Sequence, residues 1–488
     1  MNVNQKSAIN ATMWSLFERM STQIVSFVIG IVLARLLSPH DFGIVGLTTV
    51  FVSISNVFID SGFSNSLIRK IDRNEDDLTT AFYFNVLVGV ATYGILWFTA
   101  PYISIYFEEP ILDILVKIAG INILFRSLCI VQTAIFTSNL NIRLLTITNL
   151  CSQIPSGLLA ILMAYNGMGV YALVLQTVTS SFLQTSLLWM CSKWIPKGNI
   201  SKLSFKYLWG FGSKLLAANL IGAIFSHIYS VLIGKFIGKN ELGFYSKASH
   251  LSDSISGIST GIVTRITLPI LADYQNDKYK LCQKFREIMR LLVMVLAPLS
   301  SIISFTSNDI VVMLWTEKWL FSAEILKILI VGVIFLPISQ VSSSLMQAVG
   351  RSGLILKLEF PKKIIYIIYI AIGFQYGVIG LTVTMIFINL TGALINMYAT
   401  KKIVEYSYIS QIIDIVKYFL IAYIVGFICG FLPKFSYKIF NITEISLSII
   451  LLYIIILIVI RDDTFLKYES LTHNKISHGF KKNNKESI

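Results

Sequence analysis

Charged side chains inside long apolar stretches are the residues of this sequence whose types could do chemistry. Arg19 and Lys214 each lie about one turn inside such a stretch, and Arg126, Arg265 and His227 lie in others. A Lys or Arg at the centre of a membrane helix costs about 2.5–3.5 kcal/mol on insertion scales, so it normally faces a wet cavity or a partner. Arg offers bidentate donors to phosphate oxygens, and Lys offers a point charge. These five residues are therefore the predicted cationic, anion-binding set.

Each of these residues also has a purely structural interpretation. Arg19 can snorkel from a helix end to the lipid headgroups, and Arg126 can pair with a nearby residue. Arg265 can be a positive anchor at a cytoplasmic helix end. His227 can be a neutral histidine hydrogen-bonded to a neighbouring helix, or a group that takes up a proton near neutral pH. The sequence leaves both interpretations open.

Three carboxylates are candidates for binding a proton or Na⁺, because a carboxylate inside a membrane is the usual carrier of such an ion. Glu18 lies beside Arg19 and can equally be a snorkelling end charge. Asp60 closes an apolar stretch, where a helix-end or turn role is the alternative. Asp253 lies on a Ser-rich stretch, residues 249–259, that suits a wet helix face, so the sequence favours Asp253 among the three.

Two pairs of opposite charge flank corresponding turns between apolar stretches. Arg35 and Asp41 flank the first turn, and Lys235 and Glu241 flank the second. Since the two pairs occupy similar segments, we expect them to set the turns between helices or to form ion pairs that gate one side of the protein.

The composition predicts a membrane protein without a sizeable soluble domain. Of the 488 residues, 55% are hydrophobic and 14% are charged, whereas soluble domains carry roughly 25% charged residues. Apolar stretches of about 20 residues, the length that crosses a bilayer, recur along the chain. Because helices satisfy their own backbone in lipid, the predicted fold is all-α and polytopic.

Charge and cysteine usage exclude other classes of protein. The formal charge of +14 comes mainly from Lys and Arg in short loops between apolar stretches. The positive-inside rule explains this excess without a nucleic-acid partner. The five cysteines occur singly, so the sequence indicates neither a disulfide framework nor a metal site, and it holds no ATP-binding loop.

Fourteen transmembrane helices are predicted. An even number places both termini on one side, and Lys and Arg favour cytoplasmic termini by more than two to one. Residues 1–11 resemble a short tail rather than a signal peptide, and residues 461–488 are predicted to be a disordered cytoplasmic tail. The predicted helices are 12–33, 41–60, 79–100, 112–136, 145–165, 168–190, 207–233, 242–270, 286–306, 321–349, 356–374, 377–398, 411–432 and 442–460.

An internal repeat organises these helices. Residues 33–43 align with 233–243 in their basic, acidic and glycine positions, and residues 169–173 align with 377–381. A repeat of six helices enters from the same side in both copies, so the copies are parallel lobes with a central path between them. The predicted divisions are an N-terminal lobe, a C-terminal lobe, a helix pair and a tail, at 1–198, 199–403, 404–461 and 462–488.

Several segments resemble Wzx-type polysaccharide flippases, particularly the WzxC-like branch of the multidrug/oligosaccharidyl-lipid/polysaccharide exporter superfamily. The resemblance rests on ARLLSPHDFG at 34–43 and on residues 62–70, 78–85, 242–248 and 317–319. It implies two six-helix lobes that alternate access, with undecaprenyl-pyrophosphate-linked oligosaccharides as substrates. The cationic set would then attract the pyrophosphate.

Two rival functions remain at this stage. A multidrug exporter of the same superfamily, driven by H⁺ or Na⁺, would have a more apolar pocket. A polysaccharide polymerase or ligase would carry a large external loop with catalytic Arg or His residues, which this sequence lacks.

The resemblance implies no cofactor. It implies membrane lipids and the lipid-linked oligosaccharide as partners, together with polymerase and chain-length machinery, in a bacterial cytoplasmic (inner) membrane.

Overall fold

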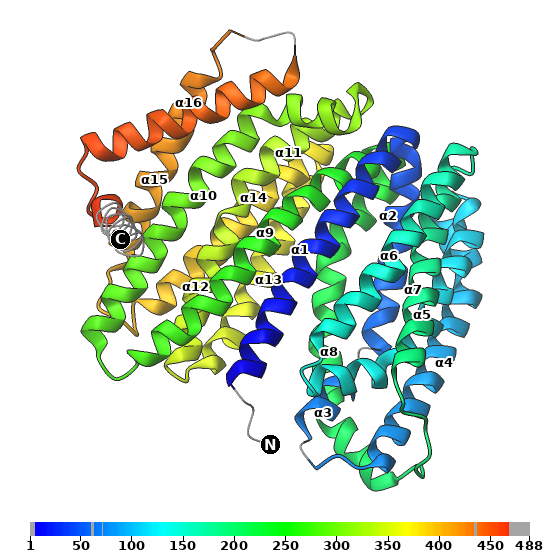
Figure 1. Ribbon diagram of the computed structural model, residues 1–488. Helices are drawn as coiled ribbons and strands as arrows, with labels where there is room; N and C mark the ends of the chain where they lie inside the picture. The colour runs from blue at the N-terminus through cyan, green and yellow to red at the C-terminus, as the bar shows by residue number, and fades with distance from the viewer. Residues whose placement is uncertain (1–4, 60–62, 71, 434–436, 468–488) are drawn as a thin grey trace, which may run out of the picture. The chain divides into compact units, whose positions relative to one another are not determined.

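The computed structural model describes residues 5–59, 63–70, 72–433 and 437–467, and this part of the chain is built from helices without strands (Figure 1). The helices are α1 (Gln5–Leu36), α2 (Pro39–Ile59), α3 (Phe63–Arg69), α4 (Glu75–Phe107), α5 (Ile111–Ser138), α6 (Ile142–Tyr165), α7 (Val170–Cys191), α8 (Lys202–Leu232), η1 (Ile233–Ile237), α9 (Lys239–Asp273), α10 (Lys278–Trp315), η2 (Glu317–Trp319), α11 (Leu320–Val333), α12 (Phe335–Ala348), α13 (Ser352–Phe374), α14 (Gly377–Thr400), α15 (Tyr408–Cys429) and α16 (Lys438–Val459).

The predicted all-α membrane fold is confirmed. Each of the fourteen predicted ranges overlaps a helix, with 321–349 divided between α11 and α12. Among the described residues, twelve helical segments are long and apolar enough to cross a membrane. α7 and α13 fall outside these twelve, α13 because Lys357, Glu359, Lys362 and Lys363 lie in its first half.

Several predicted boundaries were wrong, for identifiable reasons. α4 begins at Glu75 instead of residue 79, since Asn74 and Asp77 form a capping box. α10 begins at Lys278 instead of residue 286, because the Asp277 carboxylate accepts from the Lys280 backbone N–H at 3.0 Å.

The start of the predicted disordered tail is ordered. Residues 463–467 are helical, and Asp462 is only 3% exposed. Its Oδ1 accepts from the backbone N–H groups of Thr464 and Phe465 at 3.1 and 3.0 Å, which fixes this turn. Residues 468–488 lie outside the described residues.

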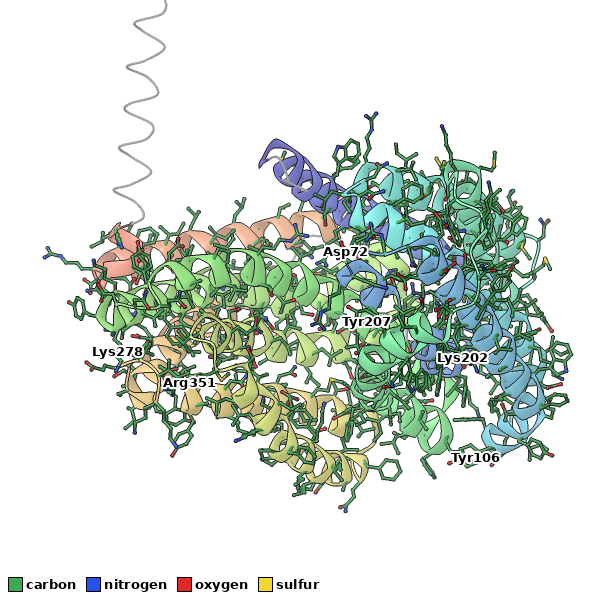
Figure 2. The ribbon with its side chains drawn as sticks, turned by 90° about the horizontal axis from the view of Figure 1, so that it is seen from below. Asp72, Tyr106, Lys202, Tyr207, Lys278 and Arg351 are labelled. Atoms are coloured by element: carbon green, nitrogen blue, oxygen red, sulfur yellow. The ribbon has the colours of Figure 1, made fainter. Side chains whose placement is uncertain are left out.

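The chain divides into two compact units, residues 1–246 and 247–488, with the division inside α9. The predicted lobe boundary near residue 198 stays a prediction. In the first unit α5 packs against α4 and α7, and α6 packs against α1 and α7. Buried Phe63, Ile123 and Val131 belong to its core. Figure 2 shows Lys202 and Tyr207 at the beginning of α8.

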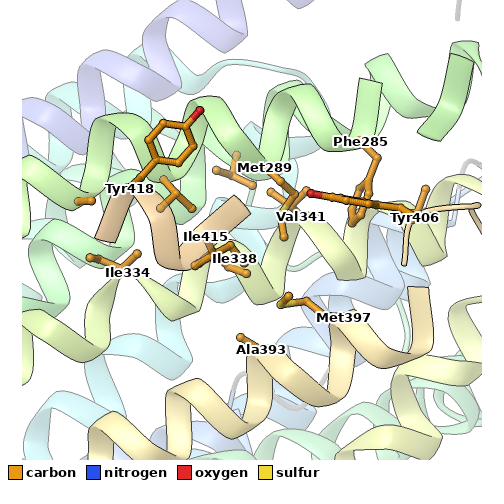
Figure 3. Close-up of a cluster of buried hydrophobic side chains, with 14 of the residues drawn as sticks. Phe285, Met289, Ile334, Ile338, Val341, Ala393, Met397, Tyr406, Ile415 and Tyr418 are labelled. Carbon is orange, nitrogen blue, oxygen red and sulfur yellow. The ribbon is translucent and has the colours of Figure 1, made fainter. Parts of the chain in front are cut away.

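In the second unit α10 packs against α11, α15 and α16, and α14 packs against α11, α12 and α13. Their shared core contains Phe285, Met289, Val341, Met397 and Tyr418 (Figure 3). Apolar side chains on several helices converge there, while many others remain exposed on the outer faces of both units, as lipid contact requires.

The aligned repeat segments meet in a reciprocal contact. A Cβ added to Gly43 would lie 1.8 Å from the Lys239 carbonyl oxygen, and a Cβ added to Gly243 would lie 1.8 Å from the Pro39 carbonyl oxygen. Lys239 aligns with Pro39, just as Gly243 aligns with Gly43. A two-fold relation between parallel copies produces this exchange, and both positions require glycine because the backbones approach so closely.

Candidate functional site

A chain of polar side chains links three helices of the first unit. Glu18 on α1 is half-buried, and its Oε1 accepts a hydrogen bond from Asn149 Nδ2 on α6 at 2.6 Å. The Oδ1 of Asn149 in turn accepts from Gln184 Nε2 on α7. One turn further along α6, Gln153 Nε2 donates to Ser26 Oγ at 2.5 Å. The polar chain therefore consists of Glu18, Asn149, Gln184, Gln153 and Ser26.

The polar chain runs into the membrane-spanning part of the unit. Asn149 lies seven residues after the start of α6, or about 10 Å along the helix axis at 1.5 Å per residue, and Gln153 lies about 16 Å along it. Unpaired polar groups in hydrocarbon cost several kcal/mol each. These hydrogen bonds offset that cost and keep a carboxylate at this depth.

A second group of polar residues lies in the second unit, on one face of α13. The Lys362 side chain is 4% exposed, and its Nζ lies 2.8 Å from Glu359 Oε1, whose side chain is 43% exposed. Lys363 Nζ lies 5.3 Å from the centre of the Tyr366 ring. The buried lysine is thus matched within its own helix by a carboxylate one turn away.

Amide and hydroxyl groups join the neighbouring helices α12 and α14. Asn396 on α14 is buried, and its Nδ2 donates to Ser339 Oγ on α12 at 2.7 Å. α13 and α14 run antiparallel, and Tyr369 of α13 lies 3.2 Å from Thr391 of α14. Going back along α13 and forward along α14 from this contact, Lys362 and Asn396 lie at a similar level. The Oδ1 of Asn396 has no hydrogen-bond partner.

The sequence identified Glu18 but missed the other members of both groups. Asn149, Gln153 and Gln184 are neutral amides, which give no distinctive signal in one sequence. The charges of α13 were visible as four ionisable residues within the predicted helix 356–374. Four ionisable residues in one predicted membrane helix were the sequence signal that could have identified this group.

The remaining predicted residues lie on several helices. Arg19 is exposed on α1, Arg126 is exposed on α5, and His227 and Arg265 are half-buried on α8 and α9. Arg126 and Arg265 belong to different compact units, so a single cationic site that contains both stays a prediction.

Of three further predicted residues, only Asp253 has a described side chain. Lys214 lies in α8, but its side chain is outside the described part, and Asp60 is outside the described residues altogether. Asp253 is exposed on α9, and its Oδ2 accepts from Ser249 Oγ at 3.2 Å on the predicted Ser-rich face.

The predicted gate residues lie where the two repeat copies meet. The Asp41 backbone N–H donates to Ser38 Oγ at 3.2 Å, and the Ser38 backbone N–H donates to Asp41 Oδ2 at 2.9 Å, so the two residues form a capping box at the start of α2. Lys235 pairs with Glu108 at 2.8 Å, and its hydrogen bond and charge hold the pKa of the Glu108 carboxyl below its usual value. Arg35 is exposed and Glu241 is half-buried at the same helix ends.

Glu109 adds to this group. Its Oε1 lies 3.6 Å from Lys239 Nζ and 3.6 Å from His40 Nε2. The ion pairs to Lys235 and Lys239, together with the contact to His40, which is an ion pair only when its imidazole is protonated, link the end of α4 to both repeat copies. We call Glu108, Glu109, Lys235, Lys239 and His40 the outer ion-pair group.

Ion pairs also tie the ends of three helices in the second unit. Asp414 on α15 lies 2.8 Å from Arg286 Nε and 2.6 Å from an Arg290 guanidinium nitrogen on α10. Asp462, after α16, lies 2.5 Å from Lys417 Nζ. Burial alone would raise the pKa of Asp462, but hydrogen bonds from Lys417 and the Phe465 backbone hold it below its usual value.

Comparison with known sequences identifies relatives over most of the chain. The model of a family described as "Polysaccharide biosynthesis protein" matches residues 32–324. Teichuronic acid biosynthesis protein TuaB of Bacillus subtilis (strain 168) is 25% identical over 431 residues, 87% of this chain and 88% of TuaB. Lipopolysaccharide biosynthesis protein WzxC of Escherichia coli (strain K12) is 21% identical over 405 residues, 82% of each chain. These relatives confirm the resemblance seen in the sequence.

A solved structure gives the same fold. The lipid II flippase MurJ in an inward closed conformation superposes with a TM-score of 0.72 over 93% of this chain and 99% of that one, at 17% identity. At this identity the likeness concerns the fold, and it agrees with the predicted exporter architecture.

Proposed function

The chain belongs to the polysaccharide biosynthesis protein family, and from this premise we propose that it is a flippase for undecaprenyl-pyrophosphate-linked oligosaccharides. It moves each repeat unit across the bacterial cytoplasmic membrane for the assembly of O-antigen, capsule or exopolysaccharide. The observation that carries this proposal is the polar chain from Glu18 through Asn149 to Gln184, which places hydrogen-bonding groups inside membrane-spanning helices. A hydrophilic glycan needs hydrogen-bonding groups along its path through the membrane, while its polyprenyl tail stays in lipid.

The transport cycle follows from the repeat. The two copies rock to open the path to one side and then to the other. Arg19 and Lys214, with Arg126, Arg265 and His227, attract the pyrophosphate on the cytoplasmic side. The outer ion-pair group and the contact at Gly43 must separate to release the glycan. Glu18, the carboxylate of the polar chain, couples this cycle to an H⁺ or Na⁺ gradient.

Transport fits the architecture better than an enzyme activity does. The described connections between helices are short, whereas a polymerase or ligase needs a large external loop for its catalytic residues. The protein lies in the inner membrane with both termini in the cytoplasm, and it delivers its substrate to polymerase and chain-length machinery.

Deleting the gene tests this function. Mass spectrometry of polyprenyl-linked glycans from the deletion strain should show an undecaprenyl-pyrophosphate oligosaccharide that is complete but unpolymerised. The intact gene should restore the normal pool. A normal lipid-linked pool together with altered drug sensitivity would contradict the proposal and favour a multidrug exporter.

A further inference from the structure

A groove outside the polar chain lies between the start of α4 and the start of α8. It has a volume of about 250 Å³. Its walls are Tyr83, Phe84 and Leu87 of α4, Ile200 of the preceding linker, and Phe205 of α8, with Lys202 at the edge. We call it the α4–α8 groove. Its lining is mainly apolar, with one ammonium group and three hydroxyl-bearing residues (Thr80, Tyr83 and Ser201), so it suits a hydrocarbon chain that ends in an anion.

Hydrogen bonds hold the linker against α4 and fix the groove. The backbone N–H groups of Gly198 and Ser201 donate to Thr79 Oγ1 and Thr80 Oγ1, each at 3.0 Å. The Asn199 N–H donates to Asp76 Oδ1 at 2.7 Å. These hydrogen bonds attach the linker wall of the groove to the α4 wall. The groove therefore exists before a ligand binds, and binding requires little reorganisation of the protein.

Aromatic packing stiffens the same region. Phe205 packs against Phe84 with ring centres 5.1 Å apart, and Phe63 of α3 stacks on Phe84 at 4.4 Å. Trp209 stacks on Phe205 at 5.9 Å. Filling the groove therefore requires no movement of these rings, because they are already held on their far sides.

The groove faces lipid at the end of a membrane-spanning helix. Leu87 and Ile200 are 66% and 69% exposed, and α4 is one of the helices apolar enough to cross a membrane. Lys202 is the first residue of α8 and lies beside the start of α4, at the end of the groove that the positive-inside rule assigns to the cytoplasmic side. An apolar groove with a lysine at this level fits a lipid whose tail lies along α4 and whose phosphate meets Lys202.

We propose that the α4–α8 groove binds the polyprenyl chain of the lipid-linked substrate next to its pyrophosphate, with Lys202 as the phosphate contact. This inference rests on the proposed function and adds where the lipid moiety docks. Phosphatidylglycerol and other anionic membrane lipids offer the same chemistry. The substrate is favoured because the proposed function already brings a prenyl pyrophosphate to this protein, and the groove offers it an apolar wall that ends at an ammonium group.

The test uses the purified full-length protein in phosphatidylcholine nanodiscs, with photoreactive geranylgeranyl pyrophosphate as the probe. We expect cross-links on peptides containing Leu87 or Ile200. Unlabelled geranylgeranyl pyrophosphate should compete at least tenfold more effectively than phosphatidylglycerol. Equal competition by phosphatidylglycerol would overturn the proposal in favour of an ordinary membrane-lipid site.

Matched variants locate the site. Leu87→Trp fills the groove and should reduce labelling at least tenfold, whereas Val90→Trp, at another lipid-exposed position of α4, should leave labelling unchanged. Lys202→Gln should weaken labelling several-fold, while Lys206→Gln, an exposed lysine one turn later, should not. Wild-type labelling of Leu87→Trp would overturn the proposal.

The same variants separate this inference from the proposed function. If cells that carry Leu87→Trp export polysaccharide normally and the variant still labels, the groove assignment fails while the flippase function stands. If the wild-type protein labels at the groove but its deletion leaves lipid-linked glycans unchanged, the flippase function fails and the groove remains a prenyl-pyrophosphate site.

Discussion

The two compact units hold polar groups in their helices in different ways. In the first unit Glu18 is held by the amide of Asn149, which belongs to another helix. In the second unit Lys362 is matched by Glu359 one turn away on the same helix. A charge satisfied within one helix keeps its partner whenever helices move, whereas the polar chain joins α1, α6 and α7 and depends on their arrangement. This difference is why we propose a structural role for the Lys362 pair and a role in the transport cycle for Glu18.

The largest expected loss of stability comes from removing the carboxylate that pairs with the buried Lys362. Glu359→Ala leaves the Lys362 ammonium buried without its carboxylate, and removing one partner of a buried pair typically costs about 3–5 kcal/mol. Because Glu359 is 43% exposed, we expect about 2–3 kcal/mol here. Thermal unfolding of the purified protein measures it. Lys362→Met is the matched control, and it should cost less because the half-exposed Glu359 can be solvated. Equal losses would contradict the structural role.

The next effect tests whether the polar chain is continuous. Asn149→Leu removes the residue that donates to Glu18 and accepts from Gln184. A buried group left without a partner costs about 1–3 kcal/mol. Glu18 and Gln184 are half-buried, so we expect the lower end of this range and an unfolding temperature below that of the wild type. Asn149→Asp keeps the acceptor for Gln184 but places two carboxylates together, and it should lose activity more than stability. A fully stable Asn149→Leu protein would refute the polar chain.

A smaller change separates charge from hydrogen bonding at Glu18. Glu18→Gln keeps an oxygen that accepts from Asn149 but removes the charge. We expect unchanged abundance and about a tenfold loss of transport, which corresponds to about 1.4 kcal/mol. Export of polysaccharide by complemented cells, normalised to protein abundance, measures it. Arg19→Gln, at the neighbouring exposed position, controls for general effects of neutralising this part of α1 on insertion.

The smallest effect is a pH dependence at the edge of the second unit. The pKa of Asp462 is lowered in the folded protein, so its contribution to stability is present above the unfolded value near 3.9 and is lost as the pH falls through the folded value. The wild type should therefore lose stability below about pH 4. Asp462→Asn should be less stable at pH 7 and show a weaker acid dependence. Parallel curves for the two proteins would rule out this contribution.

The sequence predicted those features that a single segment can encode. Apolar stretches of about 20 residues located the spanning helices. Glu18 was one of three carboxylate candidates, and the sequence favoured Asp253 over it. The repeat was visible at Gly43 and Gly243, because close backbone approach tolerates only glycine. Structure was needed for contacts between distant segments, such as Lys235 with Glu108, since neither residue type shows which partner it will meet.

The missed residues share one physical cause. Asn149 and Gln184 are ordinary in composition and become important only because α6 and α7 bring them together. Asp462 looked like part of a polar tail, but its burial arises from Lys417 and Tyr418 on α15. A single sequence carries no signal for such tertiary pairs, and the α4–α8 groove, made by two separate segments, was hidden for the same reason.

Translocation by the purified protein is the most direct test of the central claim. The protein would be reconstituted into liposomes whose two leaflets contain a labelled undecaprenyl-pyrophosphate oligosaccharide, and an impermeant glycosidase would be added outside. With active protein, we predict cleavage of nearly all the glycan as molecules from the inner leaflet are brought outward, and Glu18→Gln should slow this phase about tenfold. Cleavage that stops at the outer-leaflet fraction, with correctly folded protein and an imposed ion gradient, would contradict the flippase account.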